Sequence, residues 1–421
     1  VTALLSLVLF PSLSVRPARE ASLPYANPNI FLFIGGFFIA RAMERHDLHR
    51  RMAYTVLAVL GHRPRTLILS IMVATAFLSM FISNTATTML MLPLVMSLLH
   101  DREDPAFATA LLLGLAYAAS IGGVGTLIGT PPNLVLAGQL REMFHIDLTF
   151  VAWLRVGLPV VLVFLPLTWG LLTYVLFPVR NEVSGTDRTI LEKARRELGP
   201  MKPEERRVLV VFALVALLWI FRKDLNFGAW TLPGWAGILG VDSYVHDATV
   251  AIAGAMLLFL LLDRKGEALL PWEEAVRIPW GIVLLFGGGF SLAHAFQVSG
   301  LAAWIGTRLH GLGVLPYPLL ILMVALLTTF LTELTSNTAT ATVLLPILAA
   351  VAEGIHQPPL PIMVAATLAA SFAFMLPVAT PPNAIVFGSG RLRVAHMVRA
   401  GVVLNLLGAV GITLIVLTVG P

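Results

Sequence analysis

Two copies of a polar pentapeptide, Ser-Asn-Thr-Ala-Thr, lie inside apolar stretches of this sequence. The first begins at Ser83 within "FISNTATTMLMLPL", and the second begins at Ser336 within "LTSNTATATVLLPI". Ser, Asn and Thr are residues that cap helix N-termini. Each copy therefore predicts a helix start whose free N–H groups and positive dipole end favour an anion. The hydroxyl and carbonyl oxygens of the same residues are hard ligands of the kind that a small cation such as Na⁺ takes.

A second pair of motifs, "GTPPNLV" from Gly129 and "ATPPNAIV" from Ala379, also predicts helix starts within apolar segments. Proline is favoured in the first turn of a helix, where its missing N–H is not needed. We expect a helix that breaks near Gly122–Gly125 and a new half-helix that starts at Pro131. The stretch "FMLPVATPPN" (374–383) predicts an equivalent break. Four helix N-termini would then converge on one cavity at the midplane of a membrane.

The composition is that of a membrane protein. Of the 421 residues, 57% are hydrophobic and only 12% are charged, with a mean hydropathy of +0.87. A water-soluble domain has roughly twice that charged fraction. Apolar runs long enough to cross a bilayer recur without the alternation of β-strands, so the prediction is an all-α polytopic membrane protein. Cysteine is absent, which excludes disulfides and thiol chemistry.

The two pentapeptide segments, 65–99 and 316–352, are too long for one span and polar at the centre. Two half-length helices that meet at a polar tip fit them better, so each is expected to form a re-entrant hairpin. Further spans or part-spans are expected near 1–15, 28–43, 106–140, 150–178, 206–222, 246–262, 278–298, 360–390 and 395–420.

The basic residues predict the orientation of these spans. Of the 28 Lys and Arg residues, 21 lie in one set of alternate connections and 7 in the other. Positive charge concentrates in cytoplasmic loops, so the richer set is expected inside and the C-terminus outside. The polar stretch 180–207 belongs to the inside set and is expected to form an amphipathic or solvent-facing helix. No methionine precedes Val1, which suggests a truncated product.

Three landmarks recur in one order along the chain. "IFLFIGGFFIA" and "IVLLFGGGFSL" are separated by 252 residues, the pentapeptides by 253 and the two TPPN motifs by 250. A nearly constant offset indicates an internal duplication. An odd number of crossings separates the two copies, so they are expected to be inverted relative to each other. Inverted repeats with discontinuous helices are typical of secondary transporters, with the site between the repeats.

The motif segments contain almost no basic residues. There is no Lys or Arg in 66–101, 103–140 or 309–390. Helix ends offer only about half a charge each, so a divalent anion bound here would need accompanying cations. This coupling is the physical basis of symport. Glu333, an acid in a hairpin arm, is a candidate either for function or for structural capping.

Two other classes of function are disfavoured. "VFGSGR" (386–391) resembles a Gly-x-Ser-x-Gly nucleophile, but Phe387 and Arg391 occupy the two glycine places. We therefore expect no enzyme. A passive channel would not need an inverted pair of broken helices.

Together these motifs resemble the divalent anion:sodium symporter (DASS) family of dicarboxylate, citrate and sulfate carriers, over almost the whole chain. The resemblance implies an elevator-type homodimer in which each protomer has a scaffold and a transport domain. Family members usually carry about two more spanning segments before the stretch that begins here. The implied parts are a first scaffold part (1–64), transport repeat 1 (65–179), a cytoplasmic linker with the second scaffold part (180–315), and transport repeat 2 (316–421).

The resemblance also implies site residues, in two sodium sites and one substrate site. The first sodium site would use Ser79, Ser83, Asn84 and the backbone of Gly129, and the second would use Thr332, Ser336, Asn337 and the backbone of Ala379. The substrate carboxylates would meet Asn84, Thr85, Thr130, Asn337, Thr338, Thr380 and Pro381.

The expected function is sodium-coupled symport of a divalent anion, a C4-dicarboxylate such as succinate, malate or fumarate. The alternatives are a sodium-independent dicarboxylate exchanger and a sodium-coupled sulfate or citrate carrier. The expected location is the plasma membrane or inner membrane. The expected partners are a small dianion, Na⁺ as co-transported ion, the lipid bilayer and a second copy of the chain, with no nucleic acid.

Overall fold

Each pentapeptide begins a helix at the tip of a helical hairpin. A computed structural model describes residues 2–59, 63–100, 104–180, 198–226 and 230–419. The first hairpin consists of α5 (Pro64–Ser79) and α6 (Asn84–Leu98), and the second of α17 (Tyr317–Thr332) and α18 (Asn337–Gly354). Ser83 caps α6 by accepting a hydrogen bond from the N–H of Ala86 at 3.2 Å. Both segments form helical hairpins, with bounds within two residues of the expected ones, and their re-entry into a membrane stays a prediction.

The two TPPN motifs begin new helices after a break. Helix α7 (Pro105–Gly123) ends in the glycine cluster, and α8 (Pro131–Phe144) starts at the predicted proline. Likewise α19 (Pro359–Ala370) ends before an irregular stretch, and α20 (Pro381–Phe387) starts at the equivalent proline. The prediction of discontinuous helices is confirmed in both repeats.

The chain divides into two compact units, each built from segments far apart in the sequence. Unit 1 comprises Val1–His49, Ala137–Ala152 and Pro200–Ala295, and unit 2 comprises Arg50–Leu136, Trp153–Gly199 and Phe296–Pro421. Both hairpins and the starts of α8 and α20 belong to unit 2. The candidate site residues therefore all lie within one unit.

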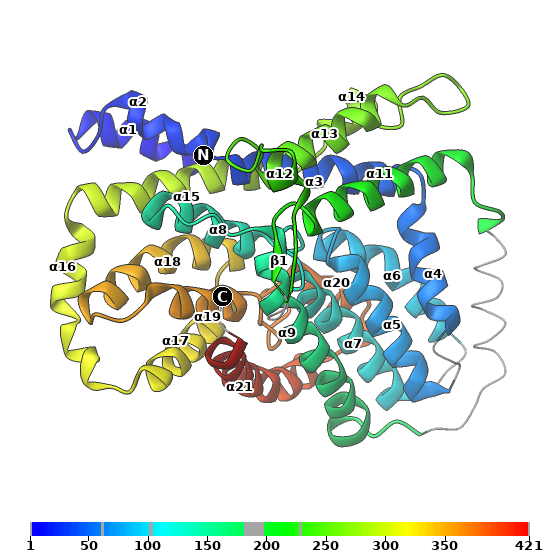
Figure 1. Cartoon of the computed structure of the whole chain (residues 1–421). Helices are drawn as coiled ribbons and strands as arrows, with labels where there is room; N and C mark the ends of the chain where they lie inside the picture. The colour runs from blue at the N-terminus through cyan, green and yellow to red at the C-terminus, as the bar shows by residue number, and fades with distance from the viewer. Residues whose placement is uncertain (1, 60–62, 101–103, 181–197, 227–229, 420–421) are drawn as a thin grey trace. The chain divides into compact units, whose positions relative to one another are not determined.

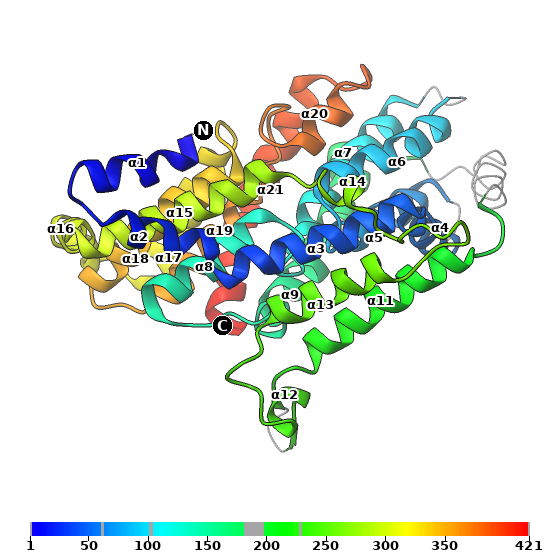
Figure 2. The ribbon, with the colours of Figure 1, turned by 90° about the horizontal axis from the view of Figure 1, so that it is seen from above.

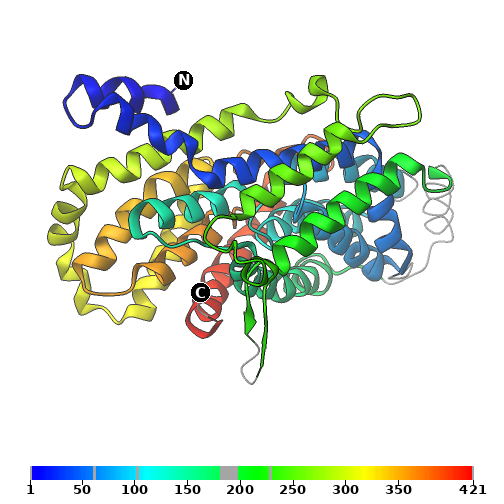
Figure 3. The ribbon, with the colours of Figure 1, turned by 45° about the horizontal axis from the view of Figure 1, so that its top comes forward.

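Unit 1 is a layer of helices with a short β-hairpin. Helix α13 packs on α3 and α11, and α14 packs on α3; Figure 3 shows α11 and α13 running side by side. Its elements are η1 (Thr2–Leu4), α1 (Leu5–Ser12), α2 (Ala18–Ser22), η2 (Leu23–Ala26), α3 (Pro28–Arg45), α11 (Pro203–Ile220), β1 (Leu225–Asn226), β2 (Thr231–Leu232), α12 (Trp235–Ile238), α13 (Asp247–Leu260), α14 (Trp272–Ala275) and most of α15 (Trp280–Val298). Strands β1 and β2 are antiparallel, with Leu225 opposite Leu232.

Unit 2 brings the two repeats together. In the first repeat α7 packs on α5 and α6, and in the second α19 packs on α17 and α18, as Figures 1 and 2 show. Helix α20, from the second repeat, packs on α6 and α7 of the first. Unit 2 also contains the π-helix η3 (Leu171–Leu176), α16 (Leu301–Arg308), η4 (His310–Val314) and α21 (Val394–Val419). Helices α4 (Leu48–Val59), α8 and α9 (Phe150–Gly170) pass from one unit to the other.

Membrane-spanning length is common among these helices. In the described part of the chain, six segments are long and apolar enough to cross a membrane: Ala18–Arg45, Pro105–Gly123, Phe150–Leu176, Trp280–Val298, Asn337–Gly354 and Val394–Val419. The hairpin arms α5, α6 and α17 are shorter apolar helices. The helix expected over 180–207 lies mostly outside the described residues, because 181–197 are not described.

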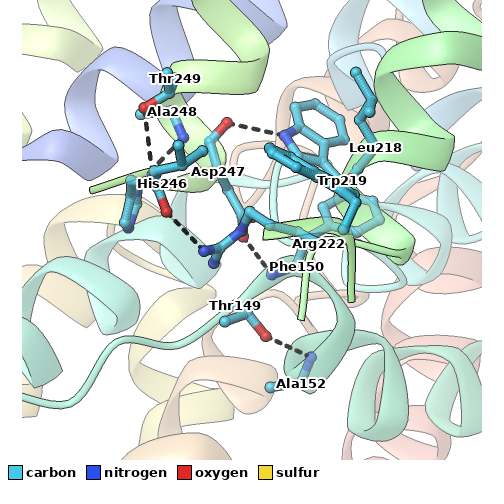
Figure 4. A network of polar contacts seen from close by, with 12 residues as sticks. Thr149, Phe150, Ala152, Leu218, Trp219, Arg222, His246, Asp247, Ala248 and Thr249 are labelled. Carbon is cyan, nitrogen blue, oxygen red and sulfur yellow. Dashed lines mark hydrogen bonds and ion pairs between the residues drawn. The ribbon is translucent and has the colours of Figure 1, made fainter. Parts of the chain in front are cut away.

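A buried ion pair organises unit 1 (Figure 4). Arg222 donates from Nε to Asp247 Oδ1 at 2.5 Å, and the two side chains are only 3% and 1% exposed. The second carboxylate oxygen of Asp247 accepts from the N–H of Phe150, the first residue of α9, at 2.8 Å. The indole of Trp219 donates to the main-chain oxygen of Asp247 at 2.9 Å. One acid thus connects the start of α9 to α11 and α13.

Replacement of Asp247 by Ala should destabilise unit 1, because it leaves the Arg222 guanidinium buried without its partner. Breaking a buried pair in this way costs about 3–5 kcal/mol. Thermal unfolding of the purified protein in detergent measures the effect. The exposed Asp242 supplies the control, since Asp242→Ala should change stability by no more than about 0.5 kcal/mol. Equal midpoints for the two variants would show that the Arg222–Asp247 pair does not stabilise the fold.

Candidate binding site at the hairpin tips

The first tip, residues 79–84, gathers several oxygen atoms. The hydroxyl of Ser79 lies 2.6 Å from Asn84 Oδ1 and 2.7 Å from the main-chain oxygen of Ala119. One hydroxyl proton can serve only one of these two acceptors at a time. Three oxygens with one proton between them form a cluster that a small cation suits. Ser79 is fully buried, whereas Asn84 is half-buried.

The second tip, residues 332–337, repeats this geometry with a threonine in place of the serine. The hydroxyl of Thr332 lies 2.8 Å from Asn337 Oδ1 and 2.9 Å from the main-chain oxygen of Ala370. Thr332 is fully buried, and Asn337 is half-buried. The structure therefore unites Ser79 with Asn84, and Thr332 with Asn337, as the resemblance implied.

Gly129 brings the first break loop (residues 124–130) against the first tip. A Cβ atom at this position would lie 2.5 Å from the Gly123 oxygen and 3.0 Å from the main-chain oxygens of Ser79 and Met80. A Cβ on Gly123 would lie 2.5 Å from Asn84 Oδ1. Only glycine allows this approach, and it places backbone carbonyls beside the Ser79–Asn84 cluster. The arrangement fits the predicted use of Gly129 in the first cation site.

Two asparagines that the site prediction omitted hold the break loops in place. Asn133 donates from Nδ2 to the main-chain oxygens of Thr126 at 2.8 Å and Gly123 at 3.4 Å. In the second repeat, Asn383 donates from Nδ2 to those of Leu376 at 3.0 Å and Ala373 at 3.2 Å. Both asparagines are fully buried. The signal was present in the sequence, because each is the Asn of a TPPN motif.

Glu333 acts on the second break loop (residues 371–380) from the second tip. Its carboxylate accepts hydrogen bonds from the consecutive N–H groups of Phe374, Met375 and Leu376, at 2.7, 2.8 and 3.0 Å. It also accepts from Nδ2 of Asn405 at 2.8 Å. Since Glu333 is only 2% exposed, its observed role is to satisfy backbone donors that the broken helix leaves free.

A tyrosine from the first repeat supports the same loop. The buried Tyr117 of α7 donates its hydroxyl to the main-chain oxygen of Phe374 at 2.7 Å, and the two rings lie 4.9 Å apart. This contact, with the packing of α20 on α6, links the site elements of the two repeats within unit 2.

The remaining predicted residues lie at helix starts around the tips. Ser83 and Ser336 are exposed N-cap residues of α6 and α18. Thr380 caps α20 by accepting from the N–H of Asn383 at 3.3 Å. The others divide by exposure: Thr130, Thr338, Thr380 and Ala379 are buried, Thr85 is half-buried, and Pro381 is exposed.

This architecture places two helical hairpins and the breaks between α7 and α8 and between α19 and α20 in one unit. The fold is similar to the crystal structure of the Alcanivorax borkumensis YdaH transporter, with a TM-score of 0.62, 13% identity, and coverage of 92% of this chain and 85% of that one. At this identity the likeness concerns the fold alone.

The family follows from a direct match of the whole chain. The model of the family described as "Sodium:sulfate symporter transmembrane region" matches residues 1–420, so this chain belongs to that family. It is 41% identical over its full length to a protein named sodium-dependent dicarboxylate transporter SdcS from Staphylococcus saprophyticus. It is 42% identical to the protein of that name from Staphylococcus aureus, and covers 82% of each. The predicted membership is confirmed.

Gly129→Ala should impair the site, because the added Cβ would clash with the Gly123 oxygen at 2.5 Å. We expect sodium-dependent uptake of a dicarboxylate into proteoliposomes to fall by at least about tenfold, since site atoms must hold their positions to about 0.5 Å.

Gly170→Ala is the matched control for this variant. A Cβ on Gly170 would meet nothing within 4 Å, so its uptake should stay within about twofold of wild type. Comparable uptake by Gly129→Ala and the wild type would show that the first break loop is not part of the binding site.

Proposed function

We propose that this chain is a secondary active transporter that carries a C4-dicarboxylate together with Na⁺. The observation that carries the proposal is the duplicated cluster, Ser79 with Asn84 and Thr332 with Asn337. Each cluster offers oxygens without a basic residue, and the segments that form the tips contain no Lys or Arg. The relatives named as sodium-dependent dicarboxylate transporters support the same substrate and ion.

In this proposal each tip holds one cation. Ser79, Ser83, Asn84 and the Gly129 backbone would bind the first Na⁺, and Thr332, Ser336, Asn337 and the Ala379 backbone the second. The bound cations supply the positive charge that the helix ends alone do not, because each helix end offers only about half a charge. The anion therefore binds well only after Na⁺, and this dependence couples the two fluxes.

The dicarboxylate would be held between the two tips. Its carboxylates would meet Asn84, Thr85 and Thr130 from one repeat, and Asn337, Thr338, Thr380 and Pro381 from the other. N–H groups at the starts of α6 and α18 and hydroxyls of the threonines are donors suited to a carboxylate. Pro381 offers only its carbonyl and its ring.

The proposal extends to domains and assembly. Unit 2, which contains both hairpins, would be the moving transport domain, and unit 1 the scaffold of a homodimer. The unit boundaries differ from the sequence-based ones: residues 137–152 belong to unit 1, and residues 50–64, 180–199 and 296–315 to unit 2. The protein would reside in the plasma membrane, with its basic connections in the cytoplasm and its C-terminus outside.

Two alternatives remain within the family. A sodium-independent exchanger would be expected to carry a fixed positive charge in place of the cations, and the segments forming the tips have none. A sulfate or citrate carrier would share the cation sites, and the family description itself mentions sulfate.

Removal of Na⁺ tests the coupling. In proteoliposomes with purified protein, uptake of labelled succinate should collapse when external Na⁺ is replaced by K⁺ or choline, because no fixed cation then neutralises the anion. An inward Na⁺ gradient should drive accumulation above the external concentration. Full uptake in choline would overturn the symport proposal and favour the exchanger.

Competition between anions tests the two-ended site. Butyrate would leave the donors at one tip unpaired, at about 1–3 kcal/mol for each buried group. Succinate should therefore compete at least about tenfold better than butyrate, since about 1.4 kcal/mol is a factor of ten.

Sulfate is the control for the distance between the tips. It is compact and should compete weakly if two separated tips share the substrate. Equal competition by butyrate and succinate would refute the two-ended site, and strong competition by sulfate alone would make the protein a sulfate carrier.

A further inference from the structure

The two repeats carry different residues at one equivalent position. The offset of 253 between the pentapeptides pairs Glu333 in the second tip with Met80 in the first. Glu333 holds the second break loop with its carboxylate, whereas Met80 offers only its main-chain oxygen, which accepts from the hydroxyl of Thr126. One tip therefore contains a buried negative charge that the other lacks.

Among the described residues, the groups that hold the Glu333 carboxylate are neutral. Its contacts are the three backbone N–H groups and the Asn405 amide, all neutral. In the described part of the chain no Lys or Arg forms an ion pair with it. A buried charge without a counter-charge is costly unless its surroundings compensate. The four hydrogen bonds compensate in part, and a nearby cation would add to them.

The position of this charge favours the binding of a cation at the second tip. Glu333 directly follows Thr332, whose hydroxyl meets Asn337 Oδ1, and Cα atoms of neighbouring residues are about 3.8 Å apart. The charge is thus carried by the residue next to the second cluster, and charges interact over roughly 8–10 Å in salt solution, with less screening where they are buried. Met80 gives the first site no such attraction.

We propose that Glu333 makes the two cation sites unequal, so that the second tip binds Na⁺ more tightly and fills first. This inference rests on the proposed function. Glu333 acts through electrostatics and through the loop that it holds, as a positioning residue rather than a ligand. The duplicated fold thereby gives two like sites, and one acid sets the order in which they fill.

Glu333→Gln is the direct test, because it removes the charge with little change in shape. Stabilisation of the purified protein by NaCl, with choline chloride keeping the ionic strength constant and no dicarboxylate present, reports cation binding. The Na⁺ concentration at half-maximal stabilisation should rise by at least about tenfold, as expected for loss of one nearby charge at the effective dielectric constant of a protein interior. The Na⁺ midpoint of succinate uptake should rise in parallel.

Two controls separate charge from loosened structure. Glu353→Gln removes an exposed acid from the same hairpin and should leave the Na⁺ midpoint within about twofold of wild type. Asn405→Ala removes one donor to Glu333 but keeps the charge. It should therefore lower the melting temperature measured in choline, and it should shift the Na⁺ midpoint less than Glu333→Gln does.

If Glu333→Gln does not fold, Glu333→Asp keeps the charge on a shorter side chain and should hold the midpoint within about threefold of wild type. The inference is overturned if Glu333→Gln leaves the midpoint unchanged, if Asn405→Ala shifts it equally, or if Glu333→Asp shifts it tenfold. Failure of the proposed function would look different, because the wild-type protein itself would then transport succinate without Na⁺.

Discussion

Breaking a helix inside a membrane leaves backbone groups without partners, and the structure of unit 2 depends on how these groups are satisfied. Non-helical backbone at that depth is tolerated only where protein or a cavity surrounds it. Here main-chain carbonyls of the break loops that follow α7 and α19 accept hydrogen bonds from Asn133 and Asn383. The N–H groups freed after α19 bind Glu333. These few side chains make it possible for helix ends to serve as binding groups.

Some contacts at the tips and break loops are the same in both repeats, and others differ. Asn84 and Asn337 meet a hydroxyl in both repeats, from Ser79 in one and Thr332 in the other. Apart from the equivalent Asn133 and Asn383, the side chains that hold the break loops differ between the repeats. In the first, the indole of Trp153 donates to Val124 at 2.8 Å, and in the second Glu333 and Tyr117 hold the loop. Symmetry of fold therefore does not imply equal affinity.

The sequence predicted the features whose causes are local. Pro131 and Pro381 begin helices, and the pentapeptides begin α6 and α18, because proline and capping residues act on the backbone beside them. The membership of the family and the all-α fold were confirmed for the same reason, since motifs and hydropathy are readable residue by residue. Partners distant in sequence were not predictable. Tyr117 and Phe374 are 257 residues apart, and Glu333 and Asn405 are 72 apart, so only folding reveals that they meet.

In the proposed function, the absence of basic residues from the tip segments accounts for the coupling of anion to Na⁺. A guanidinium in the site would hold a dianion permanently, whether or not Na⁺ was present, and transport would lose its dependence on the gradient. Neutral oxygens and helix ends bind the anion weakly until cations join it. The binding energy that Na⁺ adds is therefore also the means by which its gradient drives the anion. In the proposed asymmetry, an acid beside only one tip determines which cation binds first, without adding a group that the anion itself would bind.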